Sequence, residues 1–199
     1  MPNLLQVFTL IIFFLNFSGV SVTPLPKATS LGEYGLPHFK NKNEEVIPWS
    51  SNRPLNWNDF RSEPKRHTDA VASTSTSLGI AYQVKNSALT YQVTCNFSKT
   101  KSWGLVKTAY ILAHEQGHFD ITEIYARKLH QALQSYNFNK RNYRQDVNSA
   151  YQKIITEKEA FQEMYDKQTD HSRNKKEQAA WLMIIEKLLE DTTPYADYP

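Results

Sequence analysis

The chain has 199 residues, a net charge of +3 and a single cysteine, and these properties narrow the classes of protein to which it can belong. A chain of this length can bury a core without disulfides or a structural metal ion, and one cysteine cannot form an intramolecular disulfide. The hydrophobic fraction of 40% and the aromatic fraction of 13% are those of a folded protein. The mild basicity forms no long run of Lys or Arg, so we expect no nucleic-acid partner.

The amino terminus predicts export. An apolar run from Leu4 to Phe17 is followed by small residues and then by Pro24, which is the pattern of a secretory signal peptide. We therefore predict a signal peptide over residues 1–22, a periplasmic or extracellular location, and no stable membrane association after cleavage. Because no Lys or Arg precedes the apolar run, an uncleaved amino-terminal anchor is the alternative.

The composition changes twice along the rest of the chain. Residues 23–50 predict an irregular linker, because prolines and glycines interrupt any periodic pattern there. We expect the catalytic domain over residues 51–192 and a carboxy-terminal tail over residues 193–199. Near the start of this domain, Asn56 or Asn58 is a candidate cap for a short helical turn.

Two antiparallel strands come next. Apolar and polar residues alternate over residues 78–84 and again over residues 89–97, on either side of a turn at residues 85–87. A period of two over this length predicts a hairpin with one buried face. Cys95 falls on the buried face, which disfavours a catalytic role for its thiol.

Three helices are predicted after the hairpin, over about residues 106–135, 144–165 and 174–189, because the hydrophobic period there is helical. Strands followed by helices indicate an α+β fold. We expect an antiparallel hairpin or sheet, then a long helix that carries a histidine motif, then two further helices, in a zincin-like arrangement. The last helix has an apolar stripe that we expect to be buried, made of Ala180, Trp181, Ile184, Ile185 and Leu188.

The strongest functional signal is the sequence His114-Glu115-Gln116-Gly117-His118. Residues four apart share a face of a helix, so His114 and His118 can direct ring nitrogens to one Zn²⁺ ion. Glu115 then lies beside the ion, where it can act as general base for a zinc-activated water. Gly117 costs about 1 kcal/mol in a helix interior, which predicts that another element approaches its bare backbone. Two histidines that lie one turn apart by coincidence are the alternative.

A third protein ligand must come from elsewhere in the chain. The motif does not continue as His-x-x-Gly-x-x-His, because isoleucines occupy the required positions. On the residues alone, several candidates stay open, two within the second predicted helix and two just after it: Glu159, Glu163, Asp170 and His171.

A hydrolytic site also needs a donor to the oxyanion of the tetrahedral intermediate. Tyr165 is a candidate for this catalytic role, and simple packing is the alternative. The hairpin offers an edge strand with which an extended peptide could pair, main chain to main chain.

The histidine motif lies in the stretch HEQGHFDITEIYARKL, with PLNWNDF upstream and YDKQTDHSRNKKEQAAW downstream. Over roughly residues 54–189, these stretches resemble a bacterial family, domain of unknown function 922, whose members are described as predicted secreted zinc-dependent proteases. The resemblance favours His171 as the third zinc ligand. It also shows one departure, because Ser172 follows this histidine where glycine is expected.

We therefore expect an exported, monomeric zinc-dependent metalloprotease with a peptide or protein substrate. His114, His118 and His171 would hold Zn²⁺, with Glu115 as general base. Two alternatives stay open. One is a non-catalytic binding module that zinc merely stabilises, and the other is a zinc hydrolase that acts on a non-peptide amide.

Overall fold

The computed structural model describes residues 44–65 and 68–199, and the predicted signal peptide lies outside them. Two antiparallel sheets form in the described residues, one of three strands in the order β1-β4-β3 and one that pairs β2 with β5. The strands are β1 (Val46–Pro48), β2 (Ala72–Ser73), β3 (Thr76–Lys85), β4 (Ala88–Ser98) and β5 (Trp103–Gly104). Three helices follow the strands, which confirms the predicted α+β fold. They are α1 (Ala109–Gln134), α2 (Tyr143–Thr169) and α3 (Lys175–Asp191).

The predicted hairpin is the pair β3–β4. Asn86 and Ser87 connect the strands with φ angles of 51° and 60°, the left-handed conformation that a two-residue hairpin turn requires. Leu78 lies opposite Cys95 and both side chains are buried, so one face of the hairpin belongs to the core as predicted. Towards the turn the strands leave the core, and Val84 is exposed.

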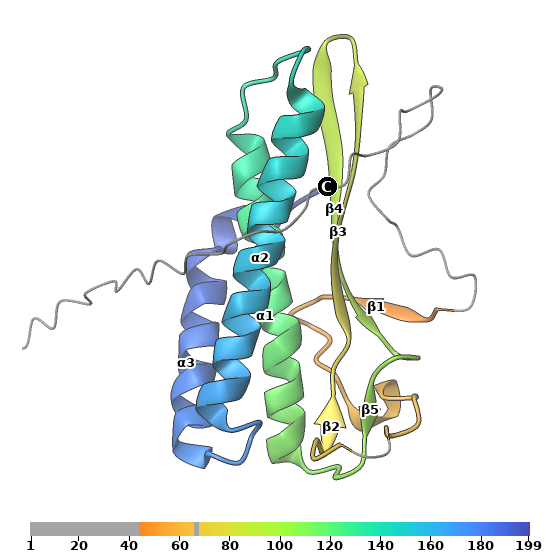
Figure 1. Cartoon of the computed structure of the whole chain (residues 1–199), viewed down its shortest axis with the longest axis vertical. Helices are drawn as coiled ribbons and strands as arrows, with labels where there is room; N and C mark the ends of the chain where they lie inside the picture. Colours follow the sequence, from red (N-terminus) through yellow and green to blue (C-terminus); the bar gives the residue numbers. More distant parts are fainter. Residues whose placement is uncertain (1–43, 66–67) are drawn as a thin grey trace, which may run out of the picture. The chain divides into compact units, whose positions relative to one another are not determined.

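Helix α1 lies at the centre of the described residues, because it packs against the hairpin on one side and against α2 and α3 on the other (Figure 1). Thr108 caps its first turn by accepting a hydrogen bond from the main-chain N–H of Ile111 at 3.2 Å. A helix between two layers must be apolar around most of its circumference. The apolar side chains that α1 buries most deeply are Phe119, Ile121, Ile124, Ala126 and Leu129, and the polar side chains of Thr122 and Glu123 are buried among them.

The short helical turn predicted before the hairpin is the 3-10 helix η1 (Trp57–Asp59). Asn56 caps it, because its side chain accepts a hydrogen bond from the N–H of Asn58 at 3.0 Å. The Asp59 carboxylate accepts a hydrogen bond from the N–H of Asn56 at 2.9 Å in return, which completes a capping box. Trp57 Nε1 donates a hydrogen bond to the Thr108 carbonyl at 3.2 Å, which holds this turn beside the start of α1.

The folded unit extends past the predicted limits of residues 51–192 at both ends. Strand β1 lies in the segment predicted as a linker, where Ile47 is buried against the core. The segment predicted as a tail contains the 3-10 helix η2 (Thr193–Tyr195). Beyond it, the Tyr198 hydroxyl donates a hydrogen bond to Glu123 of α1 at 2.7 Å. Both segments lack a periodic pattern, and tertiary contacts order them instead.

The apolar stripe predicted for helix α3 is only partly buried. Trp181 and Ile185 are buried, but Ala180 and Ile184 are exposed. Consecutive residues of a helix point about 100° apart, so only one of each adjacent pair can face the core. Gln178 occupies the inward position one turn earlier, where its amide donates a hydrogen bond to a carbonyl of α1 at 3.1 Å. Among the described helices none is long and apolar enough to span a membrane.

Helices α1 and α2 approach closely where Gly117 faces Tyr165. A Cβ atom on residue 117 would lie 2.6 Å from the Tyr165 hydroxyl oxygen, well inside van der Waals contact. Tyr165 is fully buried, and its hydroxyl donates a hydrogen bond to the His114 carbonyl at 3.3 Å. The prediction that another element approaches the bare backbone of Gly117 is therefore confirmed.

We expect Gly117→Ala to destabilise the protein, although the same change stabilises an exposed helix by about 1 kcal/mol. The new methyl group overlaps a side chain that has no room to move, and such overpacking costs about 1–3 kcal/mol. Urea unfolding measures the difference. In a Tyr165→Phe background the substitution should cost less, because the closest overlapping atom is gone. A Gly117→Ala variant as stable as the wild type would contradict the close contact between the helices.

Candidate metal centre

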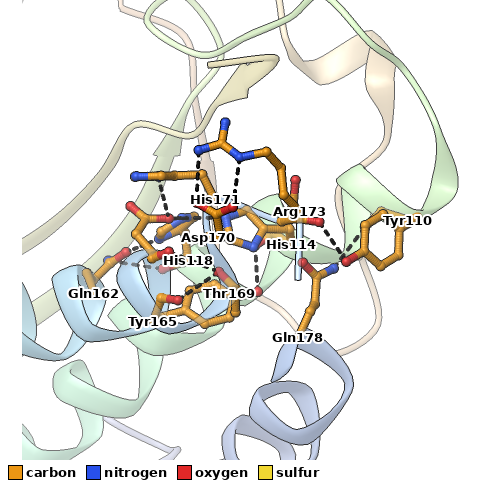
Figure 2. Close-up of polar contacts among 12 residues, drawn as sticks. Tyr110, His114, His118, Gln162, Tyr165, Thr169, Asp170, His171, Arg173 and Gln178 are labelled. Carbon is orange, nitrogen blue, oxygen red and sulfur yellow. Dashed lines mark hydrogen bonds and ion pairs between the residues drawn. The ribbon is translucent and has the colours of Figure 1, made fainter. Parts of the chain in front are cut away.

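His114 and His118 lie one turn apart on α1, and both direct Nε2 toward one carboxylate oxygen of α2. Asp166 Oδ1 lies 3.2 Å from His114 Nε2 and 3.1 Å from His118 Nε2. Figure 2 shows the two imidazoles beside the residues of α2 that surround them. In the part of the chain that the structure describes, these three side chains form a group whose ligand atoms all lie within 4.8 Å of one another. The predicted shared face of the motif histidines is confirmed.

The spacing of these atoms fits a metal ion. Zinc–ligand bonds of about 2.0–2.1 Å in a tetrahedron place neighbouring ligand atoms about 3.3 Å apart, close to the distances between Asp166 Oδ1 and the two nitrogens. Two imidazoles and one carboxylate are also a donor set that zinc takes in catalytic sites with three protein ligands. The group can therefore hold a metal ion.

Gln162 fixes the tautomer of His118. The Gln162 amide nitrogen donates to the His118 carbonyl and to Thr122 Oγ1, each at 3.2 Å. Its Oε1 is left as an acceptor and contacts His118 Nδ1, so Nδ1 must carry the proton. Nε2 is then the ring nitrogen that can bind a metal ion once the proton shared with Asp166 is displaced, which is the usual effect of a hydrogen-bonding partner behind a ligating histidine.

Asp166 and the histidines change one another's pKa. Burial raises the pKa of Asp166, but hydrogen bonds from His114 and His118 outweigh it and hold this pKa well below its usual value. Burial lowers the pKa of His118, but the hydrogen bond and charge of Asp166, aided by Glu115, raise it overall above its usual 6.5. The group thus attracts a proton in the absence of a metal ion, and metal binding must displace that proton.

Glu115 lies in the wall of a cavity of about 370 Å³ that the two histidines and Asp166 also line. Its side chain is buried, and Oε2 has no hydrogen-bond partner among the residues that the structure describes. Buried carboxylate oxygens are normally hydrogen-bonded. An unpartnered oxygen beside the metal group therefore indicates a place for a water molecule or a substrate group.

His171 lines the same cavity from the loop after α2. Its Nδ1 lies 3.6 Å from Asp166 Oδ1, and its side chain is 60% exposed. Its ring nitrogens fall outside the group of converging ligand atoms, so its role as the third ligand stays a prediction. Asp170, His171 and Ser172 all have positive φ angles. The φ of 71° at Ser172 explains why glycine is expected at this position.

Tyr165 lies behind the metal group. Its ring stacks on that of His114 with a centroid distance of 4.6 Å and an interplanar angle of 22°. Because its hydroxyl is bonded to the His114 carbonyl and the side chain is fully buried, it does not line the cavity. The contact orients the His114 ring, which is the packing role weighed for this residue, and leaves no hydroxyl free to face an oxyanion.

The remaining candidates for the third ligand do not face the motif histidines. Glu159 and Glu163 are exposed on α2. Asp170 is exposed and forms an ion pair with Arg173 at 3.0 Å. None of these carboxylates belongs to the convergent group in the described residues.

The sequence pattern does not single out Asp166 and Gln162. The sequence predicts that the second helix ends at Tyr165, but it continues to Thr169. Asp166 is therefore part of the helix, in which it lies four residues after Gln162. Residues at this spacing share a face, and a correct helix boundary would have put both side chains on the face that meets α1.

A family model described as "Bacterial protein of unknown function (DUF922)" matches residues 37–172. The chain belongs to this family. The match includes all residues of the metal group and ends before α3. No curated protein and no solved structure matched the chain. The family match shows no activity for this chain, and the proposed function therefore rests on the geometry of the site.

The zinc affinity of two variants of this DUF922 protein shows whether Asp166 or His171 is the third ligand. We expect Asp166→Ala to weaken zinc binding by at least about a hundredfold, beyond the 10–100-fold typical of residues behind the ligands, because it removes an atom on which both imidazoles converge. His171→Ala should weaken binding by less than about tenfold. Titration against a zinc indicator measures both, with Glu163→Ala as the control. A large loss in His171→Ala alone would make His171 the third ligand.

Proposed function

We propose that this DUF922 protein is an exported zinc-dependent metalloprotease. The observation that carries the proposal is the unpartnered Oε2 of Glu115 in the cavity beside the group of His114, His118 and Asp166. A structural zinc site is closed by four protein ligands and makes no use of a neighbouring free carboxylate. Three convergent ligands with an unpartnered carboxylate next to them favour an enzyme over a zinc-stabilised binding module.

His114 Nε2, His118 Nε2 and Asp166 Oδ1 would hold the zinc ion in this proposal. When bound, zinc supplies a Lewis acid that lowers the pKa of water and polarises a carbonyl group. Glu115 accepts the proton of the attacking water at a carboxylate oxygen and then delivers it to the leaving nitrogen. Gln162 keeps the Nε2 lone pair of His118 directed at the ion through the proton on Nδ1.

The amino-terminal pattern supports a location outside the cytoplasm. The apolar run and the small residues after it are those of a signal peptide, so we place the mature protein in the periplasm or the extracellular medium. A peptide substrate suits the open cavity, which is lined by an extended segment of main chain as well as by the metal group.

Glu115→Gln tests the proposal, because the amide keeps the shape of the side chain and removes the proton acceptor. We expect the variant to retain zinc and its melting temperature, while cleavage of a peptide library falls by at least about a hundredfold, the low end for general acid–base catalysis. Glu163→Gln makes the same chemical change on the exposed surface of α2 and should leave cleavage unchanged.

Two outcomes would count against a protease. A Glu115→Gln variant as active as the wild type would remove Glu115 from the mechanism. A wild-type protein that binds zinc stoichiometrically but cleaves no member of the library would favour the binding module or a non-peptide amide as substrate.

A further inference from the structure

An extended segment of main chain forms one wall of the cavity that holds the metal group. Residues 71–74 line this cavity, and residues 73–76 line a second hollow that continues along the same segment. Gln162 lines both hollows. The two hollows together make a groove that passes the metal group, with the segment along its side.

The odd-numbered residues of this segment direct their main-chain hydrogen bonds to β4, to β5 and to the residues next to these strands. Ser73 lies opposite Trp103 in the β2–β5 pair. The other bonds run from Leu105 N–H to the Val71 carbonyl at 2.8 Å, from Ser98 N–H to the Ser75 carbonyl at 2.8 Å, and from Ser75 N–H to Ser102 Oγ at 2.9 Å. These partners all lie in β4, in β5 or in the chain next to them.

The even-numbered residues direct their main-chain groups to the other edge, because neighbouring residues of a strand alternate in direction. Ala72, Thr74 and Thr76 therefore face away from β4 and β5. Thr74 lies between β2 and β3, and in the described residues neither its N–H nor its carbonyl has a hydrogen bond. Thr76 begins β3, the terminal strand of its sheet. The edge ends at Leu78, whose carbonyl accepts a hydrogen bond from the Tyr151 hydroxyl of α2 at 2.9 Å.

Unsatisfied polar side chains also concentrate at this groove. The described residues contain seven buried side-chain polar atoms without a partner, and four of them belong to residues that line the cavity of the metal group. These residues are Thr74, Trp103, His114 and Glu115. The walls of the groove therefore carry polar side chains with both donor and acceptor groups.

We propose that the edge formed by Ala72, Thr74 and Thr76 binds the substrate as an added β-strand. The proposal rests on the proposed function, because the added strand would carry its scissile bond past the metal group. An extended peptide directs the N–H and carbonyl groups of every second residue to the same side. Ala72, Thr74 and Thr76 are also every second residue, so the two sets of groups can pair. The substrate is therefore an unfolded or loop segment of at least about five residues in extended conformation, and a helical segment is excluded.

Four hydroxamates test this with the zinc-loaded, full-length protein. Acetohydroxamate binds only the metal ion, and an acetyl-Ala-Leu-Ala-Leu hydroxamate adds a peptide main chain. Two N-methylated forms of the tetrapeptide, methylated at the odd or at the even amide nitrogens, each remove half of the donors. We expect the tetrapeptide to bind more tightly than acetohydroxamate. One methylated form should lose about tenfold or more in affinity, since two main-chain hydrogen bonds disappear, and the other less than about threefold.

Equal loss in the two methylated forms, or a tetrapeptide that binds no better than acetohydroxamate, would overturn the added strand and leave the zinc hydrolase standing. Failure of acetohydroxamate itself to bind the zinc-loaded protein would mean that the ion has no open position, and it would overturn both proposals. Amide hydrogen exchange gives a second measurement. The tetrapeptide hydroxamate should protect the N–H groups of Ala72, Thr74 and Thr76, whereas those of Ser73 and Ser75 should not change, and an unchanged Thr74 would contradict the proposal.

Discussion

The packing of Tyr165 on the bare backbone of Gly117 sets the geometry of the metal group. The phenol ring fills the space that any side chain at position 117 would need, and it stacks on His114. Because Asp166 follows Tyr165 in α2 and His118 follows Gly117 in α1, this single contact holds the carboxylate beside both imidazoles. The glycine and the tyrosine therefore belong to the site, although glycine has no side chain and the Tyr165 hydroxyl is bonded to the His114 carbonyl.

The buried polar groups around this contact are those that the proposed function would use. A carboxylate that is buried without a partner, as Glu115 Oε2 is, costs free energy that an apolar residue would not. The hydrogen-bonded chain from His118 through Gln162 and Thr122 ends at Thr76 Oγ1, 2.7 Å from Thr122 Oγ1. Thr76 belongs to the open main-chain edge, so one polar network fixes both a ligand histidine and the strand that we propose binds the substrate.

Local patterns were sufficient to predict the hairpin, the order of the helices and the motif, because each depends on periodicity within one element. The bare backbone of Gly117 was likewise predictable, since glycine is unfavourable in a helix. Asp166 was not, because its role depends on a contact between residues 48 positions apart in the chain and on the last turn of α2. Strand β1 and the contacts of Tyr198 were also missed, because tertiary packing rather than periodicity orders them.

Diffraction from crystals of the zinc-loaded protein, recorded on both sides of the zinc absorption edge, tests the central claim most directly. The account predicts one anomalous peak bonded to His114 Nε2, His118 Nε2 and Asp166 Oδ1, with the fourth position open toward Glu115. A peak elsewhere in the molecule would contradict it. So would an ion closed by four protein ligands, with His171 as the fourth, because that site would have no position for water or substrate.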